Sequence, residues 1–105
     1  MNEVSTQQLL DQGFTLQGQN NHAEAIAKFK YILETGENPS ALGGLAYSQR
    51  AIGDIGSSLE SYQRLLEIEP GWAEVHYEVG TLLLSLGKAG LASDFFYNTA
   101  KLKPN

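Results

Sequence analysis

Residues 20–29 read NNHAEAIAKF and place a small residue, Ala25, four positions before a large aromatic one, Phe29. The same arrangement returns in residues 53–62, GDIGSSLESY, and again in residues 87–96, GKAGLASDFF. The three copies start 33 and then 34 residues apart, so the pattern runs through the whole chain. A period in this range is typical of helical repeats that bury their apolar faces against their neighbours. The sequence therefore predicts a repeat scaffold for binding, although the repeat does not name a ligand.

Small and large residues alternate in each copy in a way that favours close helix packing. The small residues are expected where the two helices of a repeat cross, and the aromatic ones are expected to fill the space between adjacent repeats. The small positions are Ala25, Ser58 and Ala92, and the large positions are Phe29, Tyr62 and Phe96. The small residues expected to have the same role on the preceding helix are Gly13, Ala46 and Gly80.

Apolar residues at spacings of three and four predict six helices of roughly 13 residues each. Gly36 lies where a left-handed helix end is expected, and Asn38 followed by Pro39 is typical of a cap and a first helical residue. The turns are short, so consecutive helices are expected to pack antiparallel, and no stretch alternates with the period of a strand. The expected helices cover residues 6–18, 22–34, 39–52, 55–68, 72–86 and 89–102.

The composition excludes several classes of protein. Twelve acidic residues against seven basic ones give a formal charge of −5, and the bases are scattered, which argues against a nucleic-acid partner. The acidity indicates either solubility alone or a preference for a basic or neutral peptide. The 105 residues contain no cysteine, so disulfides and thiolate metal sites are excluded. This length leaves room for one domain, over residues 1–105.

The amino-terminal residues are polar and acidic, so no signal peptide is expected. The longest apolar run is residues 82–84, which is too short to span a bilayer. The sequence therefore predicts a cytoplasmic protein that does not insert into a membrane.

With this pattern the chain resembles the tetratricopeptide repeat family. The family pattern of W-x2-L-G-x2-Y, A-x3-F and a final proline covers nearly all of residues 6–105. Pro70 and Pro104 lie one 34-residue period apart, whereas the first repeat is one residue short and has Glu37 in place of this proline. The resemblance implies an all-α fold of three tandem helix-turn-helix repeats, about 6–38, 39–72 and 73–105, that form a right-handed α-solenoid. The first helices would line a concave face, and no catalytic activity is implied.

The resemblance also implies a peptide-binding groove on the first helices. Its large members would serve as anchors, as rigid aromatic side chains do in binding sites. Its acidic members, Asp11, Glu74 and Glu78, would favour a protein or peptide partner that is apolar with basic flanks. The groove positions are Leu10, Asp11, Phe14, Gly44, Tyr47, Arg50, Glu74, Tyr77 and Glu78.

Family members that bind chaperone tails hold a terminal carboxylate with lysine, asparagine and arginine at such positions. This chain has none of these types at the corresponding sites, so an acidic carboxy-terminal tail is not an expected ligand of the groove. The residues found there are Leu10, Phe14, Gly44, Glu74 and Glu78.

Two glycines, Gly43 and Gly44, lie inside a predicted helix, where each costs about 1 kcal/mol relative to alanine. One explanation is close packing against a neighbouring helix. The other is a notch in the groove that a peptide could enter. The sequence does not separate the two.

The last helix carries two aromatic residues, Phe95 and Tyr97, where the earlier repeats have polar or basic ones. Together with Leu102 they would leave an apolar patch of the kind that marks interaction sites. This patch predicts either a homo-oligomer that associates through this helix or a continuation of the chain.

No constellation of residues supports an enzyme. The two histidines, His22 and His76, are far apart in the pattern, and the carboxylates show no convergent pair. The run from Gly80 to Lys88 has the wrong spacing for a phosphate-binding loop and lies on a predicted helix. No cofactor and no metal are expected. The leading interpretation is an adaptor that holds a peptide, and the alternative is a structural oligomerisation module.

Overall fold

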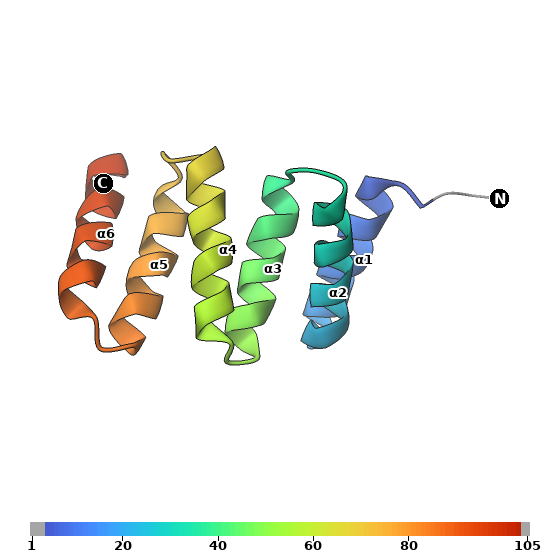
Figure 1. Ribbon diagram of the computed structural model, residues 1–105, viewed down its shortest axis with the longest axis horizontal. Coiled ribbons are helices and arrows are strands. Elements are labelled where there is room, and N and C mark those ends of the chain that lie inside the picture. The colour runs from blue at the N-terminus through green and yellow to red at the C-terminus, as the bar shows by residue number, and fades with distance from the viewer. Residues whose placement is uncertain (1–3, 104–105) are drawn as a thin grey trace. The chain divides into compact units, whose positions relative to one another are not determined.

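The computed structural model describes residues 4–103, and these residues form six α-helices and no strand (Figure 1). The all-α prediction is confirmed. Four helices have the expected bounds, α3 is one residue shorter at its end, and α5 is one residue shorter at each end. The helices are α1 (Thr6–Gly18), α2 (His22–Glu34), α3 (Pro39–Ala51), α4 (Ile55–Ile68), α5 (Ala73–Ser85) and α6 (Ala89–Leu102).

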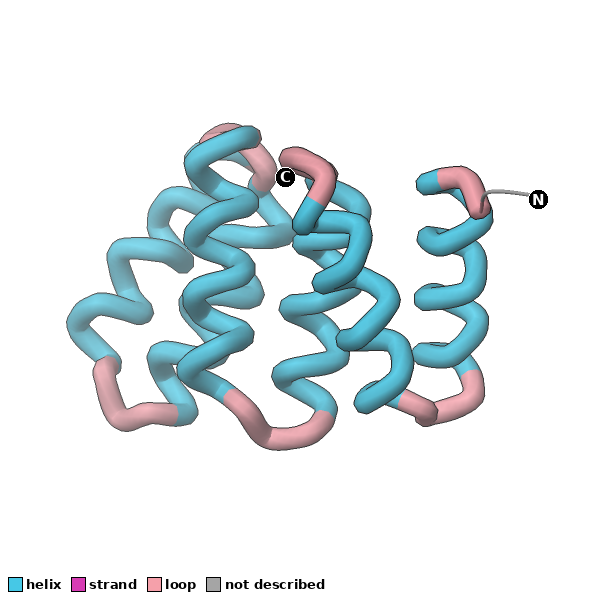
Figure 2. The backbone as a smooth tube through the Cα atoms, turned by 45° about the vertical axis from the view of Figure 1, so that its right-hand side comes forward, coloured by secondary structure: helices cyan, strands magenta, loops and turns pink. Residues whose placement is uncertain are grey.

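The chain divides into two compact units, one up to Ser61 and one from Tyr62 onward, with the division inside α4. In the first unit α2 packs against both α1 and α3, and α1 also touches α3. In the second unit α5 packs against α6. Short loops join consecutive helices, which run antiparallel within each unit (Figure 2). The expectation of a single domain over residues 1–105 stays a prediction.

Local signals in the sequence explain where the helices begin and end. The Ser5 hydroxyl accepts a bond from the Gln8 backbone N–H at 3.1 Å, and the Ser5 N–H donates to the Gln8 side chain at 2.8 Å. Asn38 caps α3 by accepting a bond from the backbone N–H of Ala41 at 3.0 Å, directly before Pro39. Gly36 has a φ of 149°, a value that side-chain-bearing residues rarely adopt.

The core of the first unit is built around Phe29, which is fully buried. A Cβ atom added at Gly13 would lie 2.6 Å from the Phe29 ring, and one added at Gly44 would lie 2.5 Å from it. The ring therefore requires glycine on both α1 and α3. The surrounding cluster consists of Leu10, Ala25, Ile32, Ala41 and Leu45, with Leu9, Leu16, Ile26 and Leu33 packed against it.

The second unit repeats this arrangement. A Cβ atom at Gly80 would lie 2.7 Å from the ring of Phe96, the counterpart of Phe29. Phe96 is half-buried, so its ring has more freedom than that of Phe29. None of the described helices is long and apolar enough to cross a membrane.

The first helices differ in the residues on one face. At three corresponding positions α3 and α5 carry buried residues, whereas α1 carries exposed polar ones. These positions are Ala41, Leu45 and Ser48 in α3, Val75, Val79 and Leu82 in α5, and Gln8, Gln12 and Thr15 in α1.

Candidate functional site

Two aromatic side chains of the predicted groove are exposed in the first unit. Phe14 on α1 is 44% exposed, and its ring centroid lies 5.2 Å from that of Phe29. Tyr47 on α3 is 57% exposed, and its ring centroid lies 6.1 Å from that of His22. Each exposed ring therefore rests on another ring of the protein, which restricts its movement.

A polar network lies directly beside Tyr47. The Gln17 side-chain amide donates to the Gly44 carbonyl at 2.6 Å and to the hydroxyl of Ser48 at 2.9 Å. The Ser48 hydroxyl, which is fully buried, also lies 3.1 Å from His22 Nδ1, and the tautomer of His22 sets which of the two donates. The network joins α1, α2 and α3 behind the exposed tyrosine.

The sequence did not indicate this network, although a signal for it exists. Ser48 stands where the third repeat has Leu82, and His22 stands where the second has Ile55. A polar residue at a position that is apolar in another repeat needs a partner once it is buried. The hydrogen bond of His22 to Ser48 and its ring contact with Tyr47 show that this histidine packs between α2 and α3.

The other groove positions of the first unit have different surroundings. Leu10 is only 8% exposed and belongs to the core cluster. Gly44 faces the Phe29 ring, so close packing accounts for this glycine and no open notch remains beside it. Asp11 is exposed and accepts a bond from the Gln7 side chain at 2.9 Å. Arg50 is half-buried and already engaged with another residue.

In the second unit Tyr77 on α5 is 53% exposed, and its ring centroid lies 5.7 Å from that of Phe96. Glu74, one turn before it, forms an exposed ion pair with Lys103, just beyond the end of α6. The hydrogen bond from Lys103 holds the pKa of the Glu74 carboxyl below its ordinary value, helped by a backbone hydrogen bond. The charge of Glu74 is therefore balanced within the protein. Glu78 is half-buried and engaged with another residue.

The three residues expected to mediate self-association do not form a uniform patch. Phe95 is half-buried, and its ring lies 5.9 Å from that of His76 on α5. Tyr97 is exposed and has the Lys101 ammonium 5.5 Å from its ring centroid. Leu102 is exposed at the edge of a shallow hollow that it shares with Pro70 and His76. The free apolar surface here comes from Tyr97 and Leu102 more than from Phe95.

No group of three or more histidine, aspartate or glutamate side chains within residues 4–103 could hold a metal ion.

Comparisons with known proteins find similarity in structure only. No family profile matches the sequence, and a search among curated proteins finds no match. A tetratricopeptide repeat protein from Parabacteroides merdae has a TM-score of 0.91 at 22% identity, covering 99% of this chain and 41% of that one. SycD, a type III secretion translocator chaperone of Yersinia enterocolitica, was solved with a peptide of the translocator YopD. It has a TM-score of 0.91 at 18% identity, covering 99% of this chain and 82% of that one.

A third structure, that of MamA, has a TM-score of 0.90 at 20% identity and is matched over 96% of this chain and 60% of its own. The chain thus spans less than two thirds of MamA and of the Parabacteroides protein. Identities in this range establish the fold and nothing further. With its helix pairs and its small-residue and aromatic packing, the chain has the fold of the tetratricopeptide repeat proteins.

Proposed function

We propose that this chain is an interaction module that holds a peptide segment of a partner protein against the first helices of its repeats. In the first unit the peptide would lie against Phe14 of α1 and Tyr47 of α3. Tyr77 of α5 offers the same kind of anchor in the second unit. The observation that carries the proposal is that all three rings are exposed and rest on a second ring of the protein.

Anchors of this kind bind at low entropic cost. A tyrosine or phenylalanine has few rotatable bonds, and one that is already held in place loses little freedom when a partner covers it. The partly buried hydrogen bonds of Gln17 to Gly44 and Ser48 hold the backbone of α3 next to Tyr47 in place. SycD, which has the same fold, was solved with a translocator peptide bound.

The expected partner segment is apolar with basic flanks. Apolar side chains would cover the aromatic rings, and Asp11 offers an exposed carboxylate whose only described hydrogen bond comes from Gln7. The formal charge of −5 favours the approach of a basic segment. Glu74 contributes less than its type suggests, because a basic residue of the partner would have to replace Lys103.

Selection from a displayed library of random peptides tests this proposal. Peptides enriched on the intact protein are expected to be apolar with basic flanks, and the Tyr47→Ala, Tyr77→Ala double variant should bind them at least about tenfold more weakly, chiefly through faster dissociation. Tyr97→Ala is the matched control, because Tyr97 is also exposed but lies on α6, which is the second helix of its repeat and no part of the proposed site. Equal affinity of the enriched peptides for the double variant would show that the rings are not the anchors.

A second candidate is an oligomerisation module that associates through α6. It is favoured by the exposure of Tyr97 and Leu102. SycD was also solved as an alternative dimer. The dependence of molecular mass on concentration separates the two candidates, since a module whose main contact is its own copy must associate without a peptide. A non-catalytic role and a cytoplasmic location are part of the leading proposal and rest on the sequence.

A further inference from the structure

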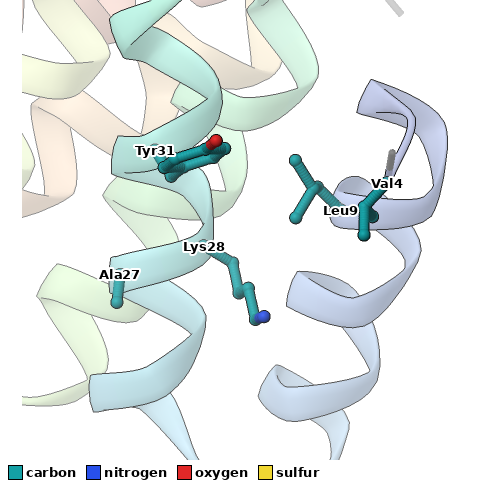
Figure 3. A pocket seen from close by; sticks show the side chains of 5 residues that line it. All are labelled: Val4, Leu9, Ala27, Lys28 and Tyr31. Carbon is teal, nitrogen blue, oxygen red and sulfur yellow. The ribbon is translucent and has the colours of Figure 1, made fainter. Parts of the chain in front are cut away.

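A hollow of about 700 Å³ opens between α1 and α2 of the first unit. Figure 3 shows Leu9 and Val4 from the α1 side and Lys28 and Tyr31 from the α2 side around it. Ala27 completes the lining. Val4 and Tyr31 are exposed, whereas Leu9 and Lys28 are half-buried. Among the lining side chains, Lys28 and Tyr31 each carry one polar group, and the other three are apolar.

The seam between the two helices of a repeat, here α1 and α2, corresponds to the seam between α5 and α6 in the second unit, where ring side chains fill much of the space. The counterparts of Leu9 and Lys28 are His76 and Phe95, whose rings lie 5.9 Å apart. His76 Nε2 donates to the Pro70 carbonyl at 2.7 Å, and the hollow that remains has a volume of about 290 Å³. The seam of the first unit lacks this aromatic ring and has a lysine in its place.

Lys28 is a half-buried lysine that borders a second hollow, lined by the carboxylates of Asp11 and Glu24. No residue within the described range 4–103 forms an ion pair or hydrogen bond with its ammonium group. A carboxylate approaching from the side of this second hollow would therefore meet two like charges. A carboxylate approaching through the hollow between α1 and α2 would meet the lysine first.

We propose that this hollow binds the carboxy terminus of a peptide that ends in a bulky apolar residue. The terminal side chain would lie against Val4, Leu9 and Tyr31, where the second unit has the ring of its own Phe95, and the terminal carboxylate would pair with Lys28. The volume is in the range of small-ligand sites, roughly 300–1,000 Å³. The site uses none of the exposed rings of Phe14, Tyr47 and Tyr77, so it does not rest on the function proposed above.

Titrations of the 15N-labelled protein followed by NMR test the proposal with defined probes. N-acetyl-L-phenylalanine supplies the apolar group and the carboxylate, and N-acetyl-L-phenylalaninamide is its neutral analogue. The acid is expected to shift the amide signals of Leu9, Ala27, Lys28 and Tyr31 in a saturable way, with a dissociation constant in the millimolar range set by its small size. The amide is expected to bind about threefold to fivefold more weakly, as for a partly exposed ion pair.

Two lysine variants test whether Lys28 is the group that pairs with the carboxylate of the acid. Lys28→Met keeps the length of the side chain and should abolish the preference for the acid over the amide. Lys30→Met, which removes an exposed lysine two residues along the same helix, should leave the preference intact. Equal binding of the two probes, an unchanged preference in Lys28→Met, or shifts centred outside this seam would each overturn the proposal.

A third probe, octanoate, distinguishes a peptide end from a fatty acid. It has the carboxylate but neither the aromatic ring nor the amide group. Tighter binding of octanoate than of N-acetyl-L-phenylalanine at the same amide signals would refute a peptide terminus as the ligand, whereas weaker binding supports it.

Discussion

The three glycines that face an aromatic ring set the tightest constraints at the residue scale. Phe29 is enclosed between Gly13 and Gly44 and is fully buried, whereas Phe96 faces Gly80 and is half-buried. The Phe29 ring cannot move away from an added methyl group. We therefore expect Gly13→Ala and Gly44→Ala each to lower the free energy of unfolding by ~1–3 kcal/mol, and Gly80→Ala to lower it less. Urea denaturation measures all three.

Gly56 provides the control for these variants. It lies in α4, and a Cβ atom there would meet nothing within 4 Å. Gly56→Ala is expected to raise the free energy of unfolding by about 0.5–1 kcal/mol, because alanine favours the helix. If Gly44→Ala behaved like Gly56→Ala, the tight contact with Phe29 would be disproved.

The pair of Glu74 and Lys103 gives a pH dependence with a definite sign. Lys103 lowers the pKa of Glu74 in the folded protein, so the pair adds stability above the ordinary value of 4.5 and loses it as the pH falls through the lowered pKa. Lys103→Ala should move the pKa of Glu74 back toward 4.5, as read from an NMR titration of its carboxyl group. Lys101→Ala, which removes the lysine beside Tyr97, should leave that pKa unchanged.

At the scale of elements, two serines of α4 show how the first unit joins α3 to α4. Ser58 donates to the Ala46 carbonyl at 2.8 Å, and Ser61 donates to the Gln49 side-chain oxygen at 2.7 Å. All of these groups lie in buried residues. Without Ser58 the Ala46 carbonyl still accepts its helical bond, whereas without Ser61 the Gln49 oxygen has no described donor.

We therefore expect Ser61→Ala to be the more costly of the two changes. It should destabilise by about 1–3 kcal/mol, against about 0.5–1.5 kcal/mol for Ser58→Ala, which also has alanine as its counterpart at Ala25 and Ala92. Adding Gln49→Leu to Ser61→Ala should recover part of the loss. A larger effect of Ser58→Ala in thermal or urea denaturation would contradict this account.

The helices themselves follow from local signals, which is why they could be predicted. The Ser5 and Asn38 caps, Pro39, and the glycines at helix ends all act within a few residues. The polar contacts could not be predicted in the same way. The bond of Gln17 to Ser48 spans 31 residues and that of Lys103 to Glu74 spans 29, so both depend on how the helices pack.

The same limit applies to the candidate site. Carrying repeat positions from one copy to the next places Phe14, Tyr47 and Tyr77 on exposed surfaces of first helices. The same transfer of positions does not reveal that Leu10 is buried. The three copies have Leu10, Gly43 and Tyr77 at this position, and only Leu10 belongs to the core around Phe29. A shared position fixes which way a side chain leaves the helix, but neighbouring side chains decide whether it is covered.

For the whole molecule, the residues that distinguish the first and last helices are polar or small. Where α3 buries Ala41 and Leu45, α1 exposes Gln8 and Gln12. At the positions where α2 has Ile26 and Leu33, α6 has Ser93 and Ala100. An array of repeats stays soluble when its outer faces are polar, since each repeat otherwise offers an apolar face to another copy. The polar and small residues of α1 and α6 oppose the association that Tyr97 and Leu102 favour, so we expect the 105-residue chain to be monomeric.

Replacing these residues of α1 and α6 by the apolar residues found at the same positions of α2, α3 and α5 should make the chain associate. A variant with Gln8→Val, Gln12→Leu, Ser93→Ile and Ala100→Leu gives α1 the face of α5 and α3, and gives α6 the face of α2. Covering four such side chains is worth about 6–12 kcal/mol, against association costs of ~4–15 kcal/mol, so the assembly should appear only at high concentration. Because the joining faces differ, it should be head-to-tail and open-ended, with a mass that keeps rising with concentration.

A variant with only the two changes on α1, or only the two on α6, should stay monomeric in sedimentation velocity. In each of them one of the two faces that would have to join remains polar or small. Two results would contradict this view of the ends. If the fourfold variant stayed monomeric and folded, the polar residues would not be what prevents stacking. If the unmodified chain associated and Tyr97→Lys abolished the association, the contact would run through the exposed tyrosine of α6, and the oligomerisation module would become the better description of the molecule.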